Sequence, residues 1–258
     1  MPRTSGRWNG WPRRPEAAAG IAAGAKLGAL SALIPAMSEL LPAVEHETAA
    51  SPRHSILWLH GLGADGHDFA PIVPELVAAD WPALRFVFPH APVRPVTVNG
   101  GMPMRAWYDI YAFDAAARQD EAGIRASIAA TAALIARENA RGVPTERIFL
   151  AGFSQGGAIA LAAGLCHPER LAGIVALSTY LPIADTLAAE RSAANADVAI
   201  FQAHGSFDPV VVPPRGSDSR DLLRRLGYRV DWHSYPMAHA VCAEEIADLR
   251  TWLGARLA

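Results

Sequence analysis

The chain of 258 residues has little of what several classes of protein need. It has two cysteines, Cys166 and Cys242, without the paired Cys/His spacing of a zinc site, so we expect no metal centre and two buried thiols rather than a disulfide. The net charge is −2, which gives no overall attraction to nucleic acid. No apolar run approaches the roughly 20 residues of a membrane span, so no stable membrane insertion is expected.

What the chain does contain is a regular alternation of strand-like and helix-like segments, with no internal repeat. The strand-like runs are 55–60, 84–88, 147–151, 171–177, 197–203 and 229–235. The helix-like runs are 69–79, 115–140, 155–165, 217–227 and 243–257. This alternation predicts an α/β domain with a mostly parallel central sheet and helices on both faces. The longest irregular stretch, 89–110, is rich in Pro and Gly, and loops of that length tend to be functional.

The most informative segment is the Gly-x-Ser-x-Gly motif at residues 152–156. A β-branched and aromatic run ends in the motif, and an Ala-rich helical stretch begins directly after it. On such a sharp turn a serine is held away from the backbone, and the flanking glycines leave room for strand and helix to pack closely. The pattern predicts that Ser154 is a nucleophile.

A serine nucleophile needs a base, and in this architecture an acid and then a histidine follow it along the chain. Asp208 lies in a Gly/Ser/Asp-Pro loop after a buried-type strand, and His239 follows the strand-like run 229–235. Both lie just past strand ends, where ligands bind in open α/β sheets. We therefore predict a triad of Ser154, Asp208 and His239. Asp208 before a proline could also be a simple turn residue.

The reaction also needs an oxyanion hole. The backbone N–H after the nucleophile, that of Gln155, is one expected donor, and the N–H of Leu62 in the glycine-rich loop 61–66 is the other. That loop also matches the dinucleotide fingerprint Gly-x-Gly-x-x-Gly. Asp65 and Asp68 argue against this alternative, because they would face a pyrophosphate, and strand 84–88 is not followed by the expected acid.

Five segments in this order resemble the phospholipase/carboxylesterase family of α/β hydrolases, which includes acyl-protein thioesterases. They are residues 59–66, 105–109, 152–157, 204–213 and 237–241, and the resemblance spans about 55–257. It implies the α/β-hydrolase fold, the triad Ser154, Asp208 and His239, and the amides of Leu62 and Gln155 as the oxyanion hole. It also implies a serine esterase that needs no cofactor and acts on short- to medium-chain esters.

Within the family, the main activity could instead be that of an acyl-protein thioesterase or a lysophospholipase, because these enzymes share their chemistry. A binding module without catalysis is a further alternative, although such descendants usually lose a triad residue. Trp107 and Met104 in the loop 89–110, and Leu181 after a strand, are the expected substrate-binding wall. Core packing is the competing interpretation of all three. The partner is a small ester or thioester, and the resemblance permits a homodimer.

Residues 1–50 are predicted to be an N-terminal extension of a catalytic domain at 51–258. Residues 1–36 carry five basic side chains against one acid, and a weakly apolar run, 27–36, lies at their end. This resembles a secretory signal, but Lys26 and several glycines interrupt the apolar stretch. We expect a disordered extension or a mis-assigned start, with Met37 as the true one, and a cytoplasmic protein. A targeting peptide is the alternative.

Overall fold

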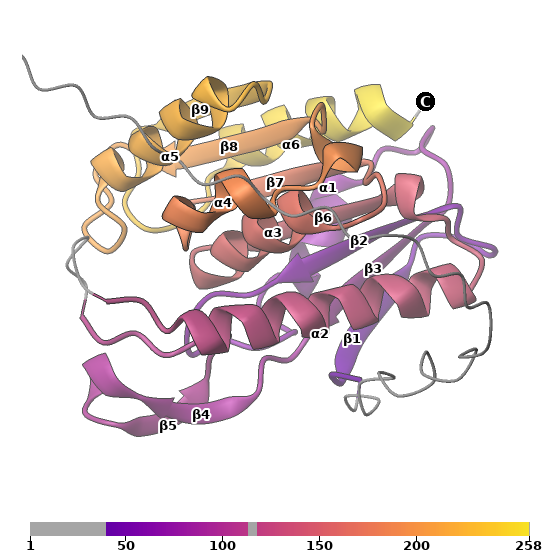
Figure 1. The fold of residues 1–258 in the computed structure, drawn as a ribbon. Helices are drawn as coiled ribbons and strands as arrows, with labels where there is room; N and C mark the ends of the chain where they lie inside the picture. Colours follow the sequence, from indigo (N-terminus) through magenta and orange to yellow (C-terminus); the bar gives the residue numbers. More distant parts are fainter. Residues whose placement is uncertain (1–39, 113–117, 258) are drawn as a thin grey trace, which may run out of the picture. The chain divides into compact units, whose positions relative to one another are not determined.

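The computed structural model describes residues 40–112 and 118–257, in which strands and helices alternate (Figure 1). The main sheet contains β1 (Ala43–Glu47), β2 (His54–Leu59), β3 (Leu84–Pro89), β6 (Ile148–Phe153), β7 (Gly173–Leu177), β8 (Ile200–Gly205) and β9 (Val230–Tyr235). The α-helices are α1 (Val73–Leu76), α2 (Glu121–Ala140), α3 (Gln155–Cys166), α4 (Ala184–Glu190), α5 (Pro213–Arg225) and α6 (Ala243–Leu257). A separate two-stranded ribbon pairs β4 (Val93–Val96) with β5 (Met102–Arg105).

The sheet order is β1-β3-β2-β6-β7-β8-β9, and every neighbouring pair is parallel except β1 with β3. The predicted α/β class with a mostly parallel sheet is therefore confirmed. Because six strands run in one direction, the loops that follow them meet at one edge of the sheet. The loops carrying the predicted site residues, after β2, β6, β8 and β9, all belong to this edge.

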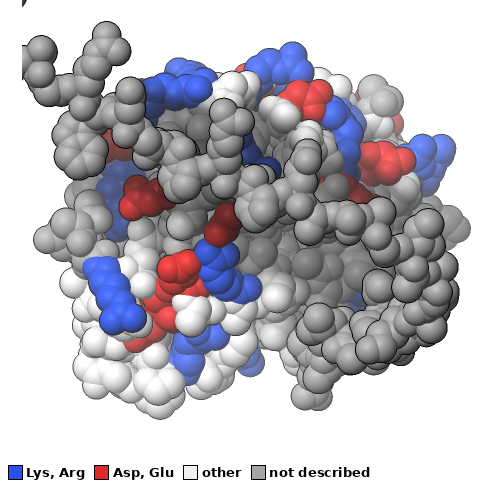
Figure 2. Space-filling view, in the orientation of Figure 1, with Lys and Arg blue, Asp and Glu red and all other residues white. Residues whose placement is uncertain are grey.

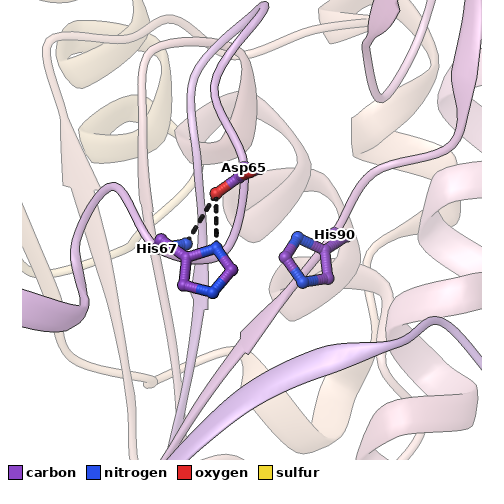
Figure 3. Close-up of side chains that lie close together, drawn as sticks. All are labelled: Asp65, His67 and His90. Carbon is purple, nitrogen blue, oxygen red and sulfur yellow. Dashed lines mark hydrogen bonds and ion pairs between the residues drawn. The ribbon is translucent and has the colours of Figure 1, made fainter.

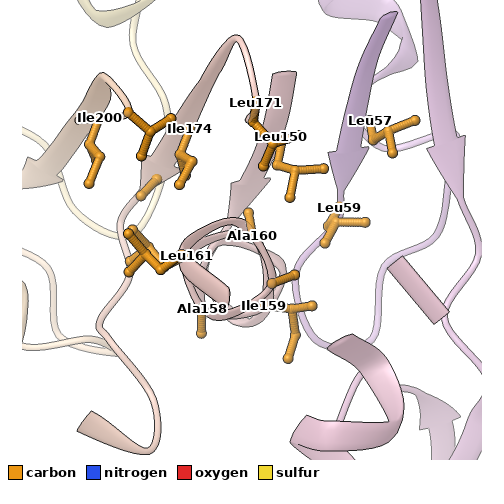
Figure 4. Packing of buried hydrophobic residues seen from close by; sticks show 14 of the residues in the cluster. Leu57, Leu59, Leu150, Ala158, Ile159, Ala160, Leu161, Leu171, Ile174 and Ile200 are labelled. Atoms are coloured by element: carbon orange, nitrogen blue, oxygen red, sulfur yellow. The ribbon is translucent and has the colours of Figure 1, made fainter. Parts of the chain in front are cut away.

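Two apolar cores lie on the two faces of the sheet. Leu57 and Leu59 of β2 belong to one core together with residues of α2, α3 and α5, whereas Ile56 and Trp58 belong to the other with α1 and α6. Successive side chains of a strand point to opposite faces of the sheet, so neighbouring residues of β2 enter different cores. Because helices cover both faces, both sets of side chains are apolar. Figure 4 shows the core around α3, with its apolar side chains beside those of the strands.

Some elements differ from the sequence expectation. The sheet begins at β1, before the domain boundary expected at residue 51, and β1 pairs with β3 over Ala43–Glu47. The stretch 89–110, expected to be irregular, contains the β4–β5 ribbon. The run predicted as a helix at 69–79 is a short 3-10 turn followed by α1. Residues 1–36 and the proposed start at Met37 lie outside the described residues.

A buried ionic network attaches β1 and β3 to α2. The Glu138 carboxylate is fully buried and accepts hydrogen bonds from Ser55 Oγ at 2.7 Å and from Arg85 at 2.9 Å. Arg85 also donates to Glu47 of β1 at 2.8 Å. Burial alone would raise the pKa of Glu138, but the hydrogen bonds from Ser55 and Arg85 lower it below its usual value. The buried Glu138 carboxylate of α2 is therefore paired with Arg85 of β3, in the sheet that carries the site.

The described helices, the surface charges and the two cysteines can each be compared with the expectations from sequence. None of the described helices is long and apolar enough to cross a membrane. Acidic and basic side chains are interspersed on the face seen in Figure 2. Cys166 and Cys242 are free, as predicted, but both are only partly buried.

Glu245, in the first turn of α6, is a buried carboxyl group of a different kind. It is fully buried, and neither carboxyl oxygen has a hydrogen-bond partner among the described residues. Burial raises the pKa of Glu245 to about 8. Between the ordinary glutamate pKa and about pH 8, the folded protein therefore holds a proton that the unfolded chain releases. Raising the pH through this window lowers the free energy of unfolding.

We expect Glu245→Gln to remove this loss of stability, because an amide does not titrate. Urea unfolding at about pH 6 and about pH 9 should show the variant gaining up to a few kcal/mol relative to the wild type as the pH rises. Glu244→Gln, at the exposed neighbouring position, is the matched control and should follow the wild type. The same pH slope in Glu245→Gln and wild type would contradict the assignment.

Candidate active site

Ser154 lies on the sharp turn between β6 and α3, and its backbone is in an unusual conformation. Its φ is +54° and its ψ is −120°, a region that non-glycine residues rarely adopt. A Cβ on Gly152 would lie 2.4 Å from the Gly156 backbone, and one on Gly156 would lie 2.2 Å from the Leu59 carbonyl oxygen. Both glycines are therefore required for the close approach of strand and helix, as the motif predicts.

The turn is fixed by contacts of its backbone rather than of the serine hydroxyl. The Ser154 N–H donates to the Leu177 carbonyl of β7 at 2.8 Å. The Ser154 carbonyl accepts from Thr179 Oγ1 at 2.6 Å. The hydroxyl is left to interact with the side chains around it.

The three residues predicted as a triad are hydrogen-bonded in a row. Ser154 Oγ lies 2.9 Å from His239 Nε2, and His239 Nδ1 lies 2.7 Å from Asp208 Oδ2. These residues follow β6, β9 and β8, respectively, and so converge at the carboxyl edge of the sheet. Asp208 is 3% exposed, whereas Ser154 and His239 are partly exposed and within reach of a substrate.

The Asp208 carboxylate is held by its own loop. Its Oδ1 accepts hydrogen bonds from the N–H groups of Val210 at 2.8 Å and Val211 at 2.9 Å, which leaves Oδ2 for His239. His204 is buried behind this loop and contacts the Val211 carbonyl through Nε2 at 2.7 Å. Burial lowers the pKa of His204. A neutral His204 therefore donates from Nε2 to Val211 and supports the loop.

The two residues predicted to form the oxyanion hole lie at the same pocket as Ser154. Leu62 and Gln155 both line the pocket that contains Ser154. Within the described parts of the chain, neither amide N–H has a hydrogen-bond acceptor. Gln155 is the first residue of α3, so the positive end of the helix dipole adds to its amide. The pair can therefore accept a negatively charged oxygen next to Ser154.

The loop that carries Leu62 passes directly beside the nucleophile. A Cβ on Gly61 would lie 3.6 Å from Ser154 Cβ. The next helical turn starts only at Ala70, so no helix N-terminus follows the glycines as a dinucleotide site would require. The geometry favours the oxyanion interpretation of this loop over the dinucleotide interpretation.

Comparison with known proteins agrees with this geometry. The profile of the phospholipase/carboxylesterase family matches residues 42–257, which is most of the chain. The chain belongs to the phospholipase/carboxylesterase family. As a member of this family, the protein is a serine hydrolase of carboxylic esters.

Among the relatives of this family member are fungal proteins named acyl-protein thioesterase 1. The one from Neurospora crassa is 41% identical over 227 residues, covering 84% of this chain and 91% of the relative. The one from Yarrowia lipolytica is 39% identical over 217 residues, covering 82% and 96%, respectively.

Solved structures of plant proteins are also similar. SOBER1 from Arabidopsis thaliana superposes with a TM-score of 0.76 at 31% identity, covering 80% of this chain and all of that one. Acyl-protein thioesterase 2 from Zea mays gives a TM-score of 0.73 at 30% identity, covering 84% and all of that chain. The α/β-hydrolase fold is thus shared along nearly the whole described chain.

The pocket of this family member differs in its lining from the sequence expectation. Trp107, Met104 and Leu181 do not line the pocket that contains Ser154. Trp107 is fully buried, and its Nε1 donates to the His60 carbonyl at 2.9 Å, so it supports the loop of Leu62 from behind. Leu181 is buried against the apolar core. Among the lining residues that were not predicted are Tyr108, Tyr111, Val210, Val211 and Arg215, and Tyr180, next to Leu181, lines the pocket as well.

The aromatic residues of this pocket are tied to one another and to the nucleophile turn. The hydroxyl groups of Tyr108 and Tyr180 lie 2.8 Å apart. The Gln155 side chain donates from Nε2 to the Tyr108 carbonyl at 2.7 Å and accepts from the Trp107 N–H at 2.8 Å. The side chain of Gln155, the first residue of α3, thus holds the pocket wall next to the nucleophile turn. The prediction of Trp107 therefore identified the correct segment of the chain, but its neighbour Tyr108 lines the pocket.

Proposed function

We propose that this enzyme hydrolyses both oxygen esters and thioesters of acyl groups through an acyl-enzyme on Ser154. The observation that carries the proposal is the hydrogen-bonded row of Ser154, His239 and Asp208 beside two backbone amides without acceptors. The names of the fungal and plant relatives support the thioester side of the activity. Both substrate types need the same attack on a carbonyl carbon and differ only in the leaving group.

In the first half of the reaction, His239 Nε2 takes the Ser154 proton as Oγ attacks the carbonyl carbon. The negative charge that develops on the carbonyl oxygen is stabilised by the amides of Leu62 and Gln155. Asp208 keeps the proton of His239 on Nδ1, so that Nε2 has its lone pair toward Ser154. The imidazolium then gives its proton to the leaving alcohol or thiol.

In the second half, water takes the place of the leaving group. His239 removes a proton from the water as its oxygen attacks the acyl carbon, and the same two amides stabilise the charge. Collapse of the intermediate releases the carboxylic acid, and the proton returns to Ser154.

The common intermediate makes a sharp test. An oxygen ester and a thioester of the same acyl group should be hydrolysed in buffer containing methanol, which competes with water for the acyl-enzyme. We expect the same ratio of methyl ester to free acid from both substrates, because both pass through the same acyl-Ser154. The ratio is measured by chromatography of the products.

Two results would contradict the proposal. Different product ratios would mean that the two substrates do not share an acyl-enzyme. Turnover of neither substrate, in a protein that is folded by circular dichroism, would favour the binding-module alternative. A lysophospholipid with the same acyl group should be measured under the same conditions. A kcat/KM higher for it than for the oxygen ester and the thioester would identify a lysophospholipase.

We also propose that the enzyme works in the cytoplasm. Its two cysteines are free, which is typical of a reducing compartment. Cell fractionation with antibody against the protein tests this, and recovery in a secreted fraction would contradict it.

A further inference from the structure

Three side chains of the kinds that can bind a metal ion lie at the same edge of the sheet as Ser154, outside the residues that the proposed mechanism uses (Figure 3). Asp65 and His67 follow β2, and His90 follows β3. Because β2 and β3 are parallel neighbours, the loops at their carboxyl ends meet. One carboxylate oxygen of Asp65 and one ring nitrogen from each histidine all lie within 4.8 Å of one another.

We propose that Asp65, His67 and His90 bind a divalent transition-metal ion such as Zn²⁺, and that the bound ion inhibits the enzyme. Two imidazoles and one carboxylate suit Zn²⁺, Ni²⁺ or Cu²⁺, whereas Mg²⁺ and Ca²⁺ prefer oxygen ligands only. Three protein ligands leave one position of a tetrahedral zinc site for water. Cys/His spacing did not reveal the site because His90 is brought to Asp65 and His67 only by the pairing of β2 with β3.

The geometry needs a small closing movement. Zinc–nitrogen and zinc–oxygen bonds of about 2.0–2.2 Å place neighbouring ligand atoms about 3.4 Å apart in a tetrahedral site. The His67 side chain is 71% exposed, and its ring lies beside that of His90, with the ring centroids 5.4 Å apart. Its Nδ1 already lies 3.0 Å from Asp65 Oδ1, and rotation of this ring toward His90 closes the set.

Two of the ligands have contacts that favour the form that binds a metal. Asp65 Oδ1 accepts a hydrogen bond from the His67 backbone N–H at 2.8 Å, and this contact lowers the pKa of Asp65. Burial and then the charge of Arg105 lower the pKa of His90, which favours the neutral imidazole. The Arg105 guanidinium donates to the Ala91 carbonyl at 2.9 Å, and its charge works against a cation at this site.

His90 connects this site to the oxyanion loop. The Gly66 N–H donates to His90 Nδ1 at 3.0 Å, so in the neutral ring Nδ1 carries the lone pair and Nε2 carries the proton. A metal on Nδ1 displaces this hydrogen bond directly. A metal on Nε2 moves the proton to Nδ1, which then cannot accept from Gly66. On either nitrogen, metal binding ends the contact.

The Gly66 amide has little freedom to find another partner. Gly66 is buried, and a Cβ added there would lie 2.2 Å from the Phe88 carbonyl oxygen, so its backbone is packed tightly against β3. Loss of the His90 contact therefore leaves the buried Gly66 amide without its acceptor, in the same loop, 61–66, that carries the amide of Leu62. We infer that the metal lowers turnover by displacing this amide from the developing oxyanion.

Binding is tested by isothermal titration calorimetry of ZnCl₂ into the tag-free full chain. We expect one Zn²⁺ per wild-type chain, and at least about tenfold weaker binding by His67→Asn. His46→Asn, at an exposed histidine on β1, is the matched control and should bind as the wild type does. Absence of zinc binding by the wild type, or equal binding by His67→Asn, would overturn the proposal.

The inhibitory effect rests on the proposed function, and ester turnover is its readout. Without metal, His67→Asn should turn over ester at the wild-type rate, because His67 touches no part of the triad. Zinc should inhibit the wild type and His46→Asn over the concentrations at which calorimetry shows binding, and His67→Asn should resist. Inhibition of all three at the same concentration would place the effect at another site and overturn the coupling.

The two proposals fail in different ways. Calorimetry with the Ser154→Ala variant needs no turnover, so it tests the metal site even if the hydrolase assignment is wrong. If the wild type bound zinc but hydrolysed no ester, only the catalytic proposal would be contradicted. MgCl₂ titrated into the wild type should give no binding, and equal binding of both metals would contradict the nitrogen-ligand assignment.

Discussion

Replacing Ser154 by alanine should lower kcat for ester hydrolysis by about 10⁴–10⁶-fold, as loss of the nucleophile does in other triad hydrolases. The substitution removes only the oxygen that attacks the substrate. The Ser154 backbone keeps its bonds to Leu177 and Thr179, so the turn and the two amides stay in place. Rates are measured on a chromogenic short-chain ester, and labelling by a fluorophosphonate should be lost in parallel.

Ser178 offers a matched control for this experiment. It also follows a strand end, at β7, its φ is +46°, and its hydroxyl has no hydrogen-bond partner among the described residues. It is fully buried, whereas Ser154 is accessible. Ser178→Ala should keep its activity and labelling, and both variants should melt near the wild-type temperature. Full turnover by Ser154→Ala would refute the assignment of the nucleophile.

The nucleophile turn could be predicted from sequence because its signals are local. The strand, the two glycines and the Ala-rich helix lie within about fifteen consecutive residues, and each restricts the backbone in a known way. The positions of Asp208 and His239 followed from chain order and from the expectation of a parallel sheet, which brings strand ends to one edge. The spacing of Ser154, His239 and Asp208 agrees with that reasoning.

The elements that could not be predicted depend on partners distant in the sequence. β1 is an edge strand with three exposed charged or polar positions, and it is held by pairing with β3 and by the ion pair of Glu47 with Arg85. β4 and β5 each contain a proline, which argues against a strand when read alone. Neither has the regular apolar alternation that marks a strand in sequence.

The pocket could be predicted only to the level of a segment. Trp107 and Tyr108 are neighbours, and which of them faces the substrate is set by the bonds of Gln155 to both. That contact spans almost fifty residues and has no sequence signature. The cluster of Asp65, His67 and His90 has the same origin, since it depends on the pairing of β2 with β3.

Asp208→Asn should lower kcat by about 10⁴-fold, although the new side chain has almost the same shape. The N–H groups of Val210 and Val211 both donate to Oδ1, so the asparagine must keep its oxygen there and turn its NH₂ group toward His239. That group donates to His239 Nδ1 and forces the ring proton onto Nε2. The lone pair that should accept the Ser154 proton is then on the wrong nitrogen.

The tautomer itself gives a readout that a merely structural change would not. Nitrogen NMR of labelled protein should show His239 protonated on Nδ1 in the wild type and on Nε2 in Asp208→Asn. Asp218→Asn, at an exposed position of α5, is the control and should keep both the tautomer and the rate. Wild-type turnover in Asp208→Asn, or a lost rate with the His239 tautomer unchanged, would show that Asp208 does not act by orienting the base. The predicted result instead means that the rate depends on the position of one proton of the His239 ring. Asp208 holds that proton on Nδ1, and the amides of Val210 and Val211 hold Asp208 in place.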